Sequence, residues 1–198
     1  MPWLYALAVL VFGLPLQASE LRLEGQLIQG GVMRGQVAPG SAVSLDGRAL
    51  RVSTDGWFVF GFGRDAAERA ELVVRPPEGR AERRALEVAK RSYRVERVDG
   101  LAPREVTPRR KDLARIEGDA RLIGAAQQLD SDGLGFTEKV AWPVVGRISG
   151  VYGSQRILNG APRAPHRGLD IAAPPGTPVG AMAGGVAVSY THLTLPTN

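Results

Sequence analysis

The sequence predicts a mainly β protein, in which a small antiparallel β-sandwich is followed by a linker with one helix and then by a second β-rich region. Three observations predict this class. Short alternating apolar runs broken by turn residues fill residues 20–100, helical spacing of apolar residues appears within 101–135, and glycine and proline separate short apolar runs from 136 onward. With 44% hydrophobic and 23% charged residues among 198, the chain has the composition of a folded protein.

Residues 1–19, MPWLYALAVLVFGLPLQAS, have the pattern of a secretory signal peptide. An apolar core runs from Trp3 to Leu16, and the small residues Ala18 and Ser19 follow it. The core is shorter than the ~20 residues needed to span a bilayer, which disfavours an uncleaved anchor. We therefore expect export and no stable membrane insertion after signal cleavage.

The region 20–100 reads as a series of short strands. In LRLEGQLI, alternation places Leu21, Leu23 and Leu27 on one face, and Asp46-Gly47 within AVSLDGRALRV is a hairpin signal. A second Asp-Gly precedes WFVFGF, and the runs ELVVR, RRALEVA and YRVERV continue the series, with the turn PPEG after the first. This spacing predicts an antiparallel β-sandwich.

The stretch WFVFGFGRDA imitates a dinucleotide-binding fingerprint, with Gly61, Gly63 and Ala66 at the positions of GxGxxA. That fold needs a full helix after the glycines, yet the next strand-like run begins at Glu71. We expect a tight turn here and no nucleotide site.

A helix is predicted in the linker of residues 101–135. Thr107 is the expected N-cap and Pro108 the expected first helical residue. Apolar residues then recur at helical spacing, at Leu113, Ile116, Ala120 and Ile123.

Charge and cysteine content exclude several functions. The net charge is +5, but basic and acidic residues are interleaved, so we expect no nucleic-acid partner. The absence of cysteine excludes disulfides, thiolate metal sites and a cysteine nucleophile. A metal site would need histidine and carboxylate ligands.

The stretch PHRGLDIAAPPGTPV contains such a pair, His166 and Asp170. If HRGLDIA is a strand, His166, Gly168 and Asp170 project from one face, because side chains alternate with period two. Zn²⁺ accepts an imidazole and a carboxylate, but a catalytic zinc site needs three protein ligands and an open position for water. Taken alone, HxxxD leaves open a surface histidine beside an aspartate in a turn.

The surrounding sequence resembles the start of the catalytic domain of the M23 family, the lysostaphin-type zinc metallopeptidases that cleave peptide cross-bridges in bacterial peptidoglycan. The resemblance is carried by WP…G.ISG.YG, by HxGxDIAAPxGTPV and by the strand-like A.AGGVAV, in order over the last third of the chain. It implies that residues 136–198 form part of a peptidase domain and that His166 and Asp170 are two of three ligands to Zn²⁺. It also implies peptidoglycan stem or cross-bridge peptides as partners and a periplasmic or secreted bacterial protein.

The sequence departs from the family pattern in its last ten residues. The family takes its third zinc ligand and a catalytic histidine from a later HxH motif, and this chain has none. His192 in SYTHLTLPTN lies only 26 positions after His166, too close for the family's second histidine strand, and we do not assign it a role. We hypothesise that residues 189–198 are foreign sequence, and we expect an incomplete, inactive fragment with no assignable catalytic residue.

Two other functions stay open. In the first, the protein would be a degenerate family member that binds murein, or activates another cell-wall hydrolase, without metal. The presence of both His166 and Asp170 favours the enzyme over this alternative. In the second, GTPVGAMAGGVAV would be the paired hairpin of a lipoyl or biotinyl carrier. That fold needs a lysine at the hairpin tip, which AMAGG lacks.

Overall fold

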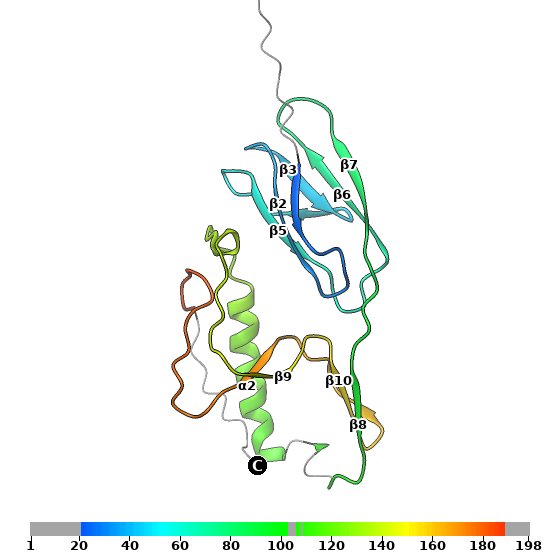
Figure 1. Cartoon of the computed structure of the whole chain (residues 1–198), viewed down its shortest axis with the longest axis vertical. Helices are drawn as coiled ribbons and strands as arrows, with labels where there is room; N and C mark the ends of the chain where they lie inside the picture. The colour runs from blue at the N-terminus through cyan, green and yellow to red at the C-terminus, as the bar shows by residue number, and fades with distance from the viewer. Residues whose placement is uncertain (1–20, 103–105, 108, 189–198) are drawn as a thin grey trace, which may run out of the picture.

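A computed structural model describes residues 21–102, 106–107 and 109–188, and it confirms a mainly β protein (Figure 1). The expected signal peptide at 1–19, Pro108 and the tail at 189–198 lie outside the described residues. Two antiparallel sheets form the N-terminal sandwich. The first has the order β1-β2-β5, with β1 (Arg22–Gly25), β2 (Val32–Gln36) and β5 (Trp57–Gly61). The second has the order β4-β3-β6-β7, with β3 (Ala42–Leu45), β4 (Arg48–Leu50), β6 (Arg69–Arg75) and β7 (Glu82–Glu87).

The core of the sandwich lies between these two sheets. Phe58 of β5 and Leu72 of β6 come from opposite sheets and are both 0% exposed. Gly35 pairs with Phe58 across the first sheet, and a Cβ at Gly35 would lie 2.2 Å from the phenyl ring. The absence of a side chain at Gly35 therefore makes room for the fully buried Phe58 ring.

The hairpin predicted at Asp46-Gly47 is confirmed. It joins β3 to β4, and Asp46 and Gly47 have φ of 48° and 78°, as a type I′ turn requires. The Asp46 carboxylate also accepts a hydrogen bond of 2.7 Å from the Glu71 backbone N–H. The predicted turn at residues 61–66 is confirmed as well, since no helix follows β5.

The strand expected from YRVERV does not belong to the sandwich. This strand, β8 (Val95–Val98), pairs in parallel with β10 (Gln155–Leu158), which pairs in turn with β11 (Ala161–Pro162). In Figure 1, β8 and β10 lie side by side, away from the sandwich. The prediction was wrong because alternation identifies a strand and the face it buries, but not its partner.

The helix predicted in the linker is confirmed as α2 (Arg110–Gln127), but its start is not where the sequence placed it. The N-cap is Arg109, with extended backbone and no side-chain capping hydrogen bond, so Thr107 does not cap the helix. The Arg109 guanidinium instead pairs with Asp112 at 3.0 Å, where a carboxylate in the first turn also suits the helix dipole.

The C-terminal region contains one two-stranded sheet, formed by β9 (Arg147–Gly150) and β12 (Asp170–Ala172). A single 3₁₀ turn, Gly135–Thr137, precedes it. The strand expected from A.AGGVAV is not formed, because residues 181–188 have no strand pairing. Isolated hydrogen bonds hold this segment instead, such as the Ala141 N–H donating to the Met182 carbonyl at 2.9 Å.

Two arginines of the sandwich contact the segment that follows α2. Arg34 donates to the Thr137 carbonyl at 3.1 Å, and Arg51 pairs with Asp130 and Asp132. The hydrogen bond from Arg51 to Asp130 raises the pKa of the Arg51 guanidinium. No helix within the described residues is both long enough and apolar enough to cross a membrane.

Candidate metal site

His166 and Asp170 meet in the folded chain, as the sequence predicted. The His166 Nε2 and Asp170 Oδ1 atoms are 3.3 Å apart, and the side chains are 32% and 61% exposed. Zinc bonds of about 2.0–2.1 Å at a tetrahedral angle separate neighbouring ligand atoms by about 3.3–3.4 Å. The observed distance therefore matches the separation expected between two adjacent zinc ligands.

The His166 Nε2 atom has no polar partner of its own among the described residues. It is covered by protein and has no hydrogen-bond partner within the part of the chain that the structure describes. Its 3.3 Å contact with Asp170 does not have hydrogen-bond geometry, so the contact does not satisfy the nitrogen. A covered imidazole nitrogen without a partner fits the donor that a metal ion requires.

The position of Asp170 depends on a glycine in the neighbouring strand. Asp170 begins β12 and pairs with Gly150 of β9, and the register shifts between Asp170 and Ile171. A Cβ at Gly150 would lie 2.4 Å from Asp170 Oδ2, closer than two non-bonded atoms approach. The carboxylate therefore occupies space that any other residue at position 150 would fill.

His166 is not on the strand where the parity argument placed it. Because β12 begins at Asp170, both His166 and Gly168 precede the strand, and alternation along a strand does not bring the pair together. Backbone hydrogen bonds hold His166 instead: its N–H donates to the Ser154 carbonyl, and its carbonyl accepts from the Gly153 N–H, both at 2.8 Å. The loop reaches the correct place by pairing with the segment that leads into β10.

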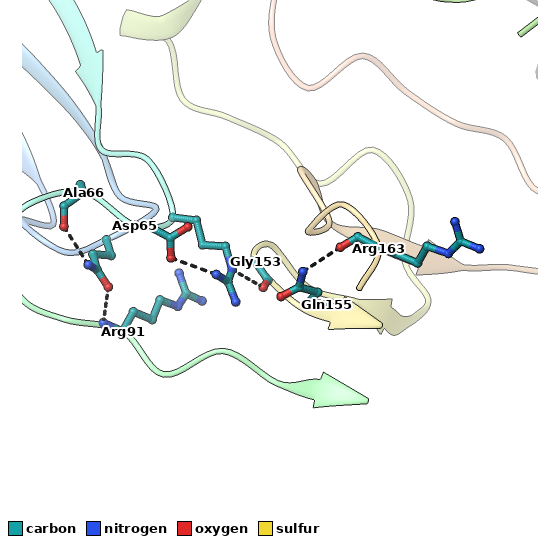
Figure 2. Close-up of polar contacts among 8 residues, drawn as sticks. Asp65, Ala66, Arg91, Gly153, Gln155 and Arg163 are labelled. Atoms are coloured by element: carbon teal, nitrogen blue, oxygen red, sulfur yellow. Dashed lines mark hydrogen bonds and ion pairs between the residues drawn. The ribbon is translucent and has the colours of Figure 1, made fainter. Parts of the chain in front are cut away.

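Hydrogen bonds to β10 also hold the segment before His166. Gln155 Nε2 donates to the Arg163 carbonyl at 2.8 Å (Figure 2). The Arg163 N–H donates to the Arg156 carbonyl at 2.8 Å. Arg163, three residues before His166, is thus fastened to β10 by two hydrogen bonds.

The pair lies on the wall of an open cavity of about 510 Å³ between β8, β9, β10 and the loop at 163–166. This volume is in the range of small-ligand sites. Arg94, Arg156 and Arg163 also line it; Arg156 pairs with Glu96 at 3.4 Å, and the other two have no carboxylate partner among the described residues. The cavity wall beside the pair is therefore basic.

The described residues do not supply a complete zinc ligand set. Among residues 21–102, 106–107 and 109–188, no group of three or more histidine, cysteine, aspartate or glutamate side chains could hold a metal ion. His192, to which the sequence gave no role, lies outside this part of the chain. The residues present fit two neighbouring corners of a zinc site and leave the other corners without a protein ligand.

Sequence reasoning missed the residues that support the pair. Gly150 and Gly153 belong to the family-like stretch G.ISG.YG, but sequence reasoning assigned neither of them a role, and Arg64 lies in the turn dismissed as a false fingerprint. The only signal in the sequence is the pair of glycines in RISGVYG, which mark close approaches of the backbone without naming the neighbour. No protein-family model matches the chain, and no curated protein is significantly similar to it.

Proposed function

We propose that this chain carries the first two zinc ligands of an M23-type metalloendopeptidase that cleaves peptide cross-bridges of bacterial peptidoglycan in the periplasm or outside the cell. The observation that carries the proposal is the 3.3 Å separation of His166 Nε2 and Asp170 Oδ1, in the motif that resembles the family's metal strand. A bound Zn²⁺ would lower the pKa of its water to about 7 and polarise the scissile carbonyl.

Each residue of the pair has a defined task in this proposal. His166 supplies a neutral imidazole nitrogen, and Asp170 supplies a carboxylate that offsets part of the charge of the cation. The adjoining cavity gives a peptide access to the same point, because both side chains lie on its wall. With only two ligands among the described residues, we expect weak zinc binding and little cleavage.

Zinc affinity, measured by competition with a chromophoric chelator, tests the ligand assignment. His166→Ala and Asp170→Asn should each abolish the weak binding, because a single remaining ligand does not hold the ion. Asp119→Asn on α2, which removes a carboxylate far along the chain from the pair, should bind zinc like the parent. Unchanged zinc affinity in the His166 and Asp170 variants would overturn the assignment.

A second function, metal-independent binding of murein, is favoured by the incomplete ligand set. Incubation with insoluble cross-linked peptidoglycan separates the two. Slow release of soluble peptides that stops with chelator and with His166→Ala supports the peptidase. Retention on the peptidoglycan without release, indifferent to chelator, supports the binding protein, and the absence of both release and retention contradicts the binding protein.

A further inference from the structure

Arg64 connects the sandwich to the candidate metal site. It lies in the turn between β5 and β6, and its Nε donates to the Gly153 carbonyl at 2.8 Å. Its guanidinium carbon lies 4.7 Å from the centroid of the Tyr93 ring, and the side chain is only 21% exposed. Figure 2 shows Gly153 between the turn that carries Asp65 and the loop that carries Arg163. A half-buried arginine with a hydrogen bond and a ring contact has a well-defined position.

Gly153 links Arg64 to His166 through two hydrogen bonds. While its carbonyl accepts from Arg64, its N–H donates to the His166 carbonyl at 2.8 Å. Gly153 has φ of +80°, and a Cβ there would lie 2.1 Å from the Tyr93 ring, so its peptide is confined between Arg64 and Tyr93. A displacement of the Gly153 peptide would move the backbone of His166.

The turn that carries Arg64 is itself fixed to the sandwich. Gln29 Nε2 donates to the Ala66 carbonyl at 2.8 Å, and Gln29 Oε1 accepts from the Arg91 N–H at 3.2 Å (Figure 2). Arg64 also pairs with Asp65 at 2.9 Å. The guanidinium therefore holds Gly153 from a fixed point and does not simply follow the loop.

We propose that Arg64 is a positioning residue for His166, so that the metal affinity of the site depends on the sandwich. The proposal rests on the proposed function, because the affinity in question is that of the His166–Asp170 pair. Residues outside the ligand set that orient a ligand typically change metal affinity by about 10- to 100-fold. Arg64 acts through one intervening residue, Gly153, and we expect its removal to lower the zinc affinity by about tenfold.

Three variants of the full chain test this by chelator competition with Zn²⁺. Arg64→Gln should lose about tenfold in zinc affinity, and Arg64→Lys should recover part of it, because lysine keeps both a donor and a cation for the Tyr93 ring. Arg83→Gln is the control, since Arg83 pairs with Glu71 on the exposed face of the sandwich. Equal zinc affinity in the Arg64→Gln and Arg83→Gln variants would overturn the proposal.

Amide hydrogen exchange of the metal-free protein gives a readout independent of zinc. Arg64→Gln should speed exchange of the Gly153 and His166 N–H groups several-fold relative to Arg83→Gln, while amides of β6 are unchanged. Unchanged exchange at Gly153 and His166 would refute the positioning role even if zinc binds. Faster exchange in a protein whose parent binds no zinc would support the positioning role and contradict the proposed function.

Discussion

Replacement of Gly150 by alanine should lower the zinc affinity of the candidate site without lowering the stability of the fold. The new Cβ would lie 2.4 Å from Asp170 Oδ2, whereas ordinary contact begins at 3.4 Å, so the carboxylate must move by about 1 Å. A zinc bond tolerates only about 0.2 Å. The carboxylate moves as a unit, so Oδ1, the oxygen that faces His166, is displaced together with Oδ2 and no longer reaches the ion. The obstructing atom is the end of a side chain that can rotate, so the strand itself is expected to remain paired.

The expected result is a 10- to 100-fold loss of zinc affinity, the range of changes that reorient a ligand, with a melting temperature close to that of the parent. Gly168→Ala is a matched control in the same motif, because a Cβ at Gly168 meets nothing within 4 Å. Chelator competition gives the affinity and circular dichroism gives the melting temperature. Parental zinc affinity in Gly150→Ala would show that Asp170 does not hold the ion in the observed position.

Two further predictions concern the fold. Phe58→Ala removes a ring that is 0% exposed between the two sheets and should lower the free energy of unfolding by about 3–5 kcal/mol, measured by urea denaturation; a loss below about 1 kcal/mol would contradict the placement of the core. Gly118→Ala within α2, where a Cβ meets nothing within 4 Å, should raise helix stability by about 0.5–1 kcal/mol, and a lowered melting temperature would show that this face of the helix is covered.

The features predicted correctly from the sequence are those that a few neighbouring residues determine. The hairpin at Asp46-Gly47 needs two residues with positive φ, and the sequence places there the two types that adopt it most readily. The residues Pro174-Pro175-Gly176 likewise predict a turn. The structure has it: Gly176 has φ of 82°, and the Thr177 N–H donates to the Pro174 carbonyl at 3.2 Å. Such signals are local, so no knowledge of the rest of the fold is needed.

The errors arise where a segment depends on a distant partner. The strand at Val95–Val98 has the alternation of a sandwich strand, but it pairs with Gln155–Leu158, some 60 positions away. Neither segment has a sequence feature that identifies the other as its partner. The start of α2 differs for a local reason. Thr107 has the side chain of an N-cap, but the backbone is still extended at Arg109 and the helix begins only at Arg110.

The His166–Asp170 pair shows that two residues can lie close together as predicted although the geometry behind the prediction is wrong. Strand parity placed both side chains on one rigid ladder, which would orient them without help from elsewhere. In the structure only Asp170 is on a strand, and His166 lies in a loop held by Gly153 and Ser154. A ligand in a loop needs outside support to stay within a few tenths of an ångström of its metal, and here that support includes a hydrogen bond from Arg64, about 100 positions earlier in the chain. If the site binds zinc, its affinity is therefore a property of the sandwich and the C-terminal region together, and transfer of HRGLDIA alone to another scaffold would not reproduce it.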